Sequence, residues 1–166
     1  MNEQTTSPVA NDAGVSGGPR TPGNQGGPST PWHLWAVGAV ALLWNCIGAF
    51  DYTMTESRNA AYLAPFTPEQ LAYFLALPKW VVATWAVGVW GGVLGSLLLL
   101  LRQCRAEQVF AVSLAGMAAT FLHNYALSDG IRIMGGGAVV FSAVICTVGI
   151  ALLLYTRHMA TAQVLR

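Results

Sequence analysis

Five polar side chains lie within or beside long apolar segments and could bind a small polar solute. They are Asn45, Asp51, Tyr52, His123 and Asn124. Amide and hydroxyl groups can exchange hydrogen bonds with the hydroxyl groups of a solute, and the Asp51 carboxyl or the His123 imidazole could carry a proton. An ionisable group inside a membrane span is costly, so it is a functional hypothesis by default. These residues are therefore the candidate substrate-binding set.

The candidate residues are expected to lie at a similar depth. If the first and third apolar segments run in the same direction, the pairs at 51–52 and 123–124 both lie near the ends of their helices. Asn45 lies about two turns deeper on the first helix, with Gly48 between, and the glycine triplet at 135–137 leaves room for a ligand. The pattern predicts a polar cavity that narrows toward Asn45. The alternative is a solvated carboxylate at a helix end and an imidazole that only links helices.

Motifs of common enzyme and metal sites are missing from the sequence. There is no HExxH pair, no nucleophile elbow and no Cys/His cluster, and Cys46, Cys104 and Cys146 form no CxxC pair. Haem or iron–sulfur chemistry would need such ligand sets. We therefore expect no enzyme activity, no cofactor and no metal site. With a net charge of +1, the chain also lacks the basic stripe that nucleic-acid binding requires.

The composition indicates a protein whose main partner is the lipid bilayer. Of 166 residues, 54% are hydrophobic and only 9% charged, whereas a soluble domain carries roughly 25% charged residues. The apolar residues gather into four blocks at about 32–54, 80–101, 109–127 and 133–155. Each block is close to the ~20 residues that cross a bilayer. The sequence predicts an all-α integral membrane protein with four spans.

The connections predict the topology. Short links between consecutive spans favour an up-down-up-down bundle. Between the first two spans, Thr67 and Gln70 form a capping box, which predicts a short helix over about 68–77 lying in the membrane interface. Residues 1–30 are rich in Gly, Pro and Ser and are expected to be a disordered tail, so 31–166 form the membrane domain.

Positive residues predict the orientation. The end with both termini and the 102–108 loop would carry Arg20, Arg102, Arg105, Arg157 and Arg166. The other end would carry Arg58, Lys79 and Arg132. Because cytoplasmic loops are enriched in Lys and Arg, we expect both termini in the cytoplasm.

Small residues at spacings of four mark the second span as a packing helix. They are Gly88, Gly91, Gly92, Gly95 and Ser96. Such residues let helix backbones approach closely in a membrane. The pattern is equally compatible with packing inside the chain, with a homo-oligomer and with docking to another subunit.

The chain also resembles a known family. The segments LWN…GAFDY and MT…RN…YL, together with FTPEQLAYF, lie in the run from Pro31 to Arg102. On these segments the chain closely resembles small four-span bacterial inner-membrane proteins, which are largely uncharacterised and often labelled "sugar transporter". The resemblance implies an inner-membrane location and a transporter of a sugar-like polar solute. We expect it to work as an oligomer, because four spans enclose little volume alone. The alternative function is a structural or accessory subunit that packs against a partner through the glycines of the second span.

Overall fold

Residues 31–166 are described by a computed structural model, and every regular element within them is a helix. The elements are α1 (Trp32–Glu56), α2 (Ala60–Leu63), α3 (Pro68–Leu75), α4 (Lys79–Leu100), α5 (Arg105–Leu122), the π-helix η1 (His123–Leu127) and α6 (Gly130–Thr161). The expected tail, residues 1–30, lies outside the described residues. For the described part of the chain, the all-α prediction is confirmed.

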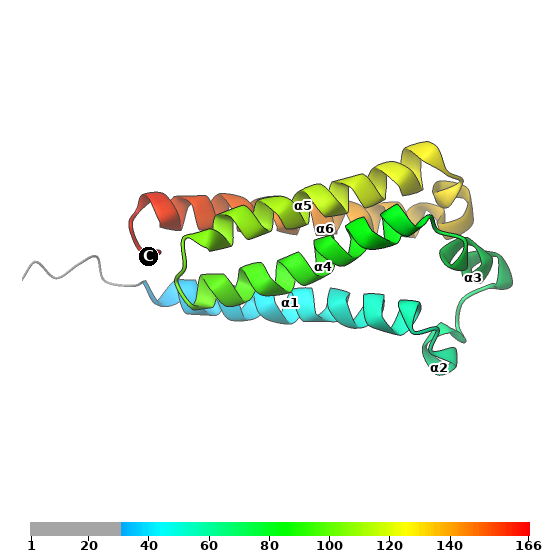
Figure 1. Cartoon of the computed structure of the whole chain (residues 1–166), viewed down its shortest axis with the longest axis horizontal. Coiled ribbons are helices and arrows are strands. Elements are labelled where there is room, and N and C mark those ends of the chain that lie inside the picture. Colours follow the sequence, from blue (N-terminus) through cyan, green and yellow to red (C-terminus); the bar gives the residue numbers. More distant parts are fainter. Residues whose placement is uncertain (1–30) are drawn as a thin grey trace, which may run out of the picture.

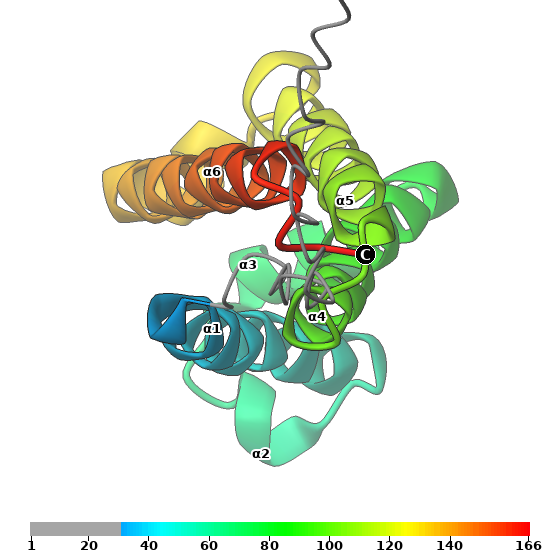
Figure 2. The same ribbon diagram turned by 90° about the vertical axis from the view of Figure 1, so that its left-hand side faces the viewer.

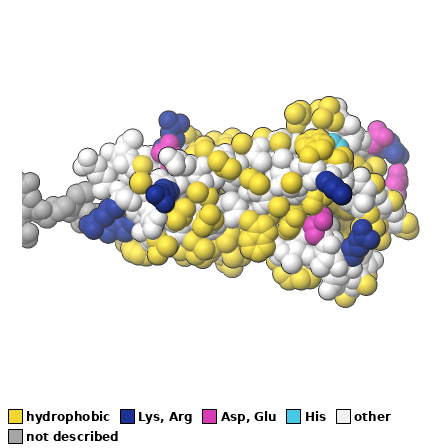
Figure 3. Space-filling model, viewed as in Figure 1, with side chains coloured by type: hydrophobic (Ala, Val, Ile, Leu, Met, Phe, Trp, Pro, Cys, Tyr) yellow, Lys and Arg dark blue, Asp and Glu magenta, His cyan; other side chains and the backbone are white. Residues whose placement is uncertain are grey.

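Four helical segments are long and apolar enough to cross a membrane. They are α1, α4, α5 together with η1, and α6, with mean hydropathy between 1.3 and 2.5. The four predicted spans are confirmed in this sense, although α6 is longer than the predicted 133–155 at both ends. Its backbone hydrogen bonding continues beyond the apolar residues from which a span is predicted. On the face drawn in Figure 3, charged side chains gather toward the two ends and hydrophobic side chains cover the middle.

The long helices pack in the order α1, α4, α5, α6. Figure 1 shows consecutive long helices running in opposite directions along the molecule. α4 packs closely against both α1 and α5, and α6 packs against α5, whereas α1 and α6 are not a closely packed pair. Figure 2 shows α1 and α6 as separate rods on the same side of the molecule. Their side chains meet where His33 Nδ1 lies 2.7 Å from the Tyr155 hydroxyl and where the Trp44 and Phe141 rings lie 6.5 Å apart.

Small residues bring the backbones of α4 and α5 together. The Ser113 hydroxyl donates to the Gly88 carbonyl oxygen at 2.5 Å, and the Thr84 and Thr120 hydroxyls lie 3.0 Å apart. A Cβ added to Gly116 would lie 2.8 Å from the Thr84 carbonyl oxygen. No side chain larger than hydrogen fits at that position without moving α4. The absence of side chains thus sets the spacing of this pair.

The five small residues of α4 serve two neighbours within the chain. Gly88, Gly91 and Gly95 face α5, whereas Gly92 and Ser96 face Asn45 of α1. Asn45 donates to the Ala41 carbonyl oxygen at 2.8 Å and to the Ser96 hydroxyl at 3.2 Å, while its amide oxygen lies against Gly92. α4 is therefore the central helix, with two faces lined by small residues.

The end of the bundle that holds the C-terminus is closed by a backbone clasp. Arg166 donates its N–H to the Arg102 carbonyl at 2.6 Å, and its own carbonyl accepts from Cys104 at 2.9 Å. The Arg102 guanidinium binds the Val164 carbonyl. Buried side chains from α1, α4, α5, α6 and the chain end pack beside the clasp: Leu34, Leu99, Ala106, Phe110, Met159, Val164 and Leu165.

The opposite end is closed by α3, the short helix expected over 68–77. Its predicted capping box is present, with Thr67 and Gln70 bonded to each other's backbone N–H. The helix ends at Leu75, two residues early, because Pro78 disfavours helical backbone in the residue before it. Tyr73 of α3 reaches the junction of α5 and α6, where its hydroxyl lies 2.8 Å from that of Ser128. α3 thus ties the connection after α1 to the far side of the bundle.

Two local departures shape the ends of α5 and α6. α5 widens into the π-helix η1, whose end is held by the Ser128 hydroxyl bonding the His123 and Asn124 carbonyls. In α6, Gly135 has φ 75°, a conformation that glycine adopts at little cost, so the helix kinks there. A Cβ at Gly136 or Gly137 would meet nothing within 4 Å. The glycine triplet therefore leaves open space rather than a packed contact.

Gly116→Ala should destabilise the fold, because the new methyl group meets the backbone of α4. We expect a loss of about 1–3 kcal/mol in the free energy of unfolding, as for other overpacked sites. Unfolding in mixed micelles with a denaturing detergent, followed by circular dichroism, measures this. Gly137→Ala is the matched control, since its methyl group points into open space, and should change stability by less than about 1 kcal/mol. Equal stabilities of the two variants would show that the α4–α5 spacing is not critical.

Candidate functional site

A cavity of about 400 Å³ lies where α1 and α6 fail to pack. Its lining combines polar, aromatic and aliphatic side chains: Trp44, Asn45, Ile47, Gly48, Asp51, Tyr62, Trp85, Val89, Met117, Phe141 and Ile145. Ile47 and Phe141 are 60% and 59% exposed although they line it. The mouth of the cavity therefore opens on the side of the bundle. We call this space the α1–α6 cavity.

Asp51 contributes a carboxylate to this cavity without a positive partner. It accepts a hydrogen bond from the Tyr62 hydroxyl at 2.5 Å. Within residues 31–166 the ion pairs are Arg132–Glu69 and Arg157–Glu107, neither of which involves Asp51. A negative charge balanced by only one neutral donor can still attract a cation or accept another hydrogen bond. Asp51 is thus the lining residue that offers a formal negative charge to a ligand.

Tyr62, which the sequence reasoning missed, is positioned by the four-residue helix α2. Asn59 caps that helix by accepting from the Tyr62 N–H at 3.0 Å, and the Tyr62 ring packs edge-on against Phe50 at 5.8 Å. The chain thereby folds back over the end of α1. An asparagine such as Asn59 is a common N-cap residue and so could have predicted the start of α2. It does not indicate which carboxylate the Tyr62 hydroxyl will contact.

The hydrogen bond to Asp51 raises the pKa of Tyr62 to about 12, with burial and the negative charge of Asp51 adding to the effect. The ordinary value is about 10. Tyr62 therefore remains a neutral donor at physiological pH, and it does not cancel the negative charge beside it.

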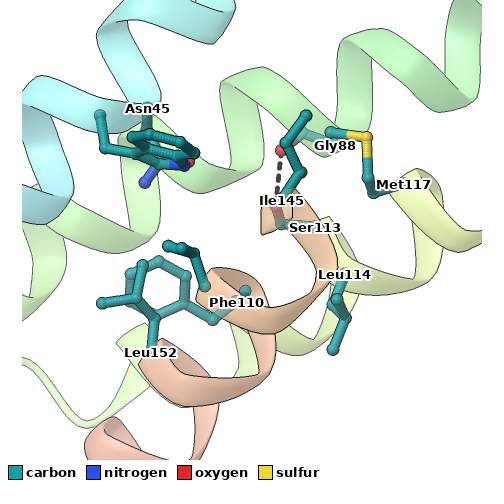
Figure 4. Close-up of a pocket in the computed structure, with 11 residues that line it drawn as sticks. Asn45, Gly88, Phe110, Ser113, Leu114, Met117, Ile145 and Leu152 are labelled. Atoms are coloured by element: carbon teal, nitrogen blue, oxygen red, sulfur yellow. Dashed lines mark hydrogen bonds between the residues drawn. The ribbon is translucent and has the colours of Figure 1, made fainter. Parts of the chain in front are cut away.

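Two further spaces adjoin the α1–α6 cavity at Trp44. A small void of about 40 Å³ reaches Ser113 and Gly88, and Figure 4 shows Asn45 at its edge. A second space of about 360 Å³ lies further along the groove between α1 and α6. It is lined by Ala36, Val37, Val40, Ala41, Trp44, Val148 and Leu152. Trp44 belongs to all three linings, so it lies where a partly polar space and an apolar space meet.

The structure divides the five candidate residues predicted from the sequence. Asn45 and Asp51 line the α1–α6 cavity, whereas Tyr52, His123 and Asn124 lie outside its lining. Tyr52 packs edge-on against the Trp85 ring at 4.9 Å and so supports a residue of the wall. Of the three candidate residues on α1, two therefore line the cavity and Tyr52 does not.

His123 and Asn124 form part of the closure at α3. The Asn124 amide oxygen accepts from the Tyr73 hydroxyl at 3.1 Å and lies 3.3 Å from His123 Nδ1. The His123 ring packs edge-on against Trp80 at 5.4 Å. Asn124 thus bonds to α3 from within η1 and does not line the α1–α6 cavity. Within the described residues, no group of three His, Cys, Asp or Glu side chains is placed to hold a metal ion.

The Tyr62–Asp51 contact should appear in an alkaline titration. Because the folded protein holds this phenolic proton more tightly than the unfolded chain does, the stabilisation is complete below about pH 10 and is lost as the pH rises through about 12. The ultraviolet tyrosinate signal of the wild-type protein should contain a component near pH 12 that is absent in Tyr62→Phe. In Asp51→Asn that component should shift toward pH 10. An unshifted component in Asp51→Asn would contradict the assigned contact.

Comparisons with known proteins leave the family open. No family model, no curated protein and no solved structure matches the chain. The resemblance described from the sequence therefore stays a prediction.

Proposed function

We propose that the chain is a multi-pass inner-membrane protein that binds and transports a small solute at the α1–α6 cavity. The observation that carries this proposal is an Asp51 carboxylate without a positive partner, in a cavity between two helices that do not pack. A residue used only to hold helices together would be buried against its partner. Asp51 instead lines a space that a ligand can fill.

The family resemblance suggests a sugar-like polar solute. Trp44 and Trp85 line the same space as the Asn45 amide and the Asp51 carboxylate. Aromatic faces can stack on the apolar face of a sugar ring, and a carboxylate can accept hydrogen bonds from its hydroxyl groups. The geometry itself requires only a small molecule that brings a hydrogen-bond donor or a positive charge to Asp51.

We propose a membrane orientation in which the four long helices form an up-down-up-down bundle and α3 lies in the interface. Antiparallel neighbours in Figure 1 and charges near both ends in Figure 3 support this arrangement. The C-terminal clasp brings Arg102 and Arg166 together at one end. Because positive residues favour the cytoplasmic side, we place that end and both termini in the cytoplasm.

Transport would need a route past Trp44. On one side of its indole lies the α1–α6 cavity, and on the other lies the apolar space of about 360 Å³. Because α6 packs against α5 and only loosely against α1, movement of α6 would join the two spaces. Apolar walls alone do not suit a polar solute, so we expect a second copy of the chain to complete the route as a homo-oligomer.

The alternative function, an accessory subunit that docks through the α4 glycines, gains less support. Gly88, Gly91 and Gly95 already contact α5, and Gly92 contacts α1. A partner would have to bind a different surface.

Asp51→Asn should abolish solute uptake while leaving membrane insertion intact. The amide keeps the shape of the side chain and can still accept from Tyr62, but it lacks the negative charge. Candidate solutes are first selected by thermal stabilisation of the purified protein, because a ligand of the folded state raises its apparent stability. Uptake is then measured in liposomes, with Asp129→Asn, an exposed carboxylate outside the cavity, as the control. Uptake by Asp51→Asn at the wild-type rate would rule out the proposed site.

A further inference from the structure

We infer that the α1–α6 cavity takes a lipophilic organic cation, whose charge is held by the Asp51 carboxylate and by the aromatic rings around it. This inference rests on the proposed function, because it names a solute class for the same cavity. It goes beyond a sugar-like solute, which the family resemblance suggests.

Charge is the first argument. Asp51 is the one formally charged residue of the eleven that line the cavity, and within residues 31–166 no Lys or Arg pairs with it. Asp51 is half-buried, and opposite charges attract each other more strongly beside apolar side chains than in bulk water. Tyr62 supplies one neutral hydrogen bond and leaves the charge in place. A cationic ligand would be attracted to Asp51, whereas an anion would be repelled.

Aromatic rings are the second argument. The indoles of Trp44 and Trp85 and the rings of Tyr62 and Phe141 line the same cavity. Faces of aromatic rings attract cations, and several rings around one space are the usual recognition device for quaternary ammonium groups. Trp85 is further held by Tyr52, and Trp44 lies near Phe141. Four aromatic rings thus line the cavity that holds the Asp51 carboxylate.

Hydrogen-bond capacity separates a cation from a sugar. The hydrogen-bonding groups of the lining are the side chains of Asn45, Asp51 and Tyr62 and the indole N–H groups of Trp44 and Trp85. Asn45 already donates to Ala41 and Ser96, and the Tyr62 hydroxyl already donates to Asp51. A sugar has several hydroxyl groups, and those left without partners would cost about 1–3 kcal/mol each. A quaternary ammonium has no hydrogen-bond donor, so it would leave no donor without a partner.

The position of the mouth favours a lipophilic molecule. Ile47 and Phe141 are exposed at the side of the bundle, where the hydrocarbon of the bilayer is expected. The far side of Trp44 is lined by aliphatic side chains. A ligand with an apolar body and a positive head would place the head at Asp51 and the body along this groove.

The test compares two probes that differ only in charge. Benzyltrimethylammonium and its neutral carbon isostere, neopentylbenzene, are titrated into the full chain in non-ionic detergent, with methyl glucoside as a third probe. Isothermal titration calorimetry and tryptophan fluorescence report binding. We expect the cation to bind at least about tenfold more tightly than the isostere. Asp51→Asn should remove this preference for the cation without changing the affinity for the neutral isostere.

Matched variants separate the charge from the fold. Asp51→Glu retains a carboxylate and should retain the preference for the cation, which guards against misfolding of Asp51→Asn. Tyr62→Phe keeps the ring and frees the carboxylate, so the cation should bind at least as tightly as it does to the wild-type protein. Asp129→Asn should leave every affinity unchanged. Circular dichroism confirms that each variant is helical.

The outcomes distinguish this inference from the proposed function. Equal affinities for the cation and its isostere, or a preference that survives in Asp51→Asn, would overturn the cation inference. Binding of methyl glucoside without binding of the cation would also overturn it, while supporting a transporter of polar solutes. If no probe binds and liposomes take up no solute, both proposals fail.

Discussion

The close approach of α4 and α5 is the contact on which the rest of the bundle depends. In a bilayer, helices gain little from burying apolar surface, so association relies on tight packing and hydrogen bonds between helices. The Ser113 hydroxyl on the Gly88 carbonyl supplies both at one point. With one face of α4 committed to α5 and another to α1, those two helices are held on either side of it. α6 then packs on α5 and reaches α1 only in part, which leaves the cavity.

Much of the fold could be predicted from the sequence because hydrocarbon length and backbone hydrogen bonding leave few choices. Four apolar blocks predict four long helices, and the capping box at Thr67 and Gln70 predicts α3. The order of packing could not be predicted, because small residues show that a helix packs closely but not against which neighbour. The π-helix after Leu122 was also missed, since the Ser128 hydrogen bond at its end becomes apparent only in three dimensions.

Two of the five candidate residues, Asn45 and Asp51, line the α1–α6 cavity, and the reason is geometric. At roughly 100° per residue, Asn45 and Asp51 lie about 60° to either side of Gly48, so helical periodicity places all three along one broad side of α1. The prediction that His123 and Asn124 belong to the same cavity rested on their matching depth, and depth does not indicate in which direction a side chain points. Tyr62 was missed because its role depends on how the loop after α1 folds back, and loop paths are set by tertiary contacts. The polar pattern of the sequence therefore indicated lining residues on α1. It did not indicate the aromatic residues that complete the lining of the cavity.

The separation of α1 and α6 along the chain has a consequence for biogenesis. α4 and α5 are joined by a short connection, so their hairpin can form as soon as both have left the ribosome and entered the bilayer. α1 can join that hairpin through Gly92 and Ser96 without any later part of the chain. The cavity, by contrast, needs Phe141 and Ile145 of the last helix. During synthesis the Asp51 carboxylate must therefore remain beside lipid or water until α6 arrives, so ligand binding requires insertion of the last helix.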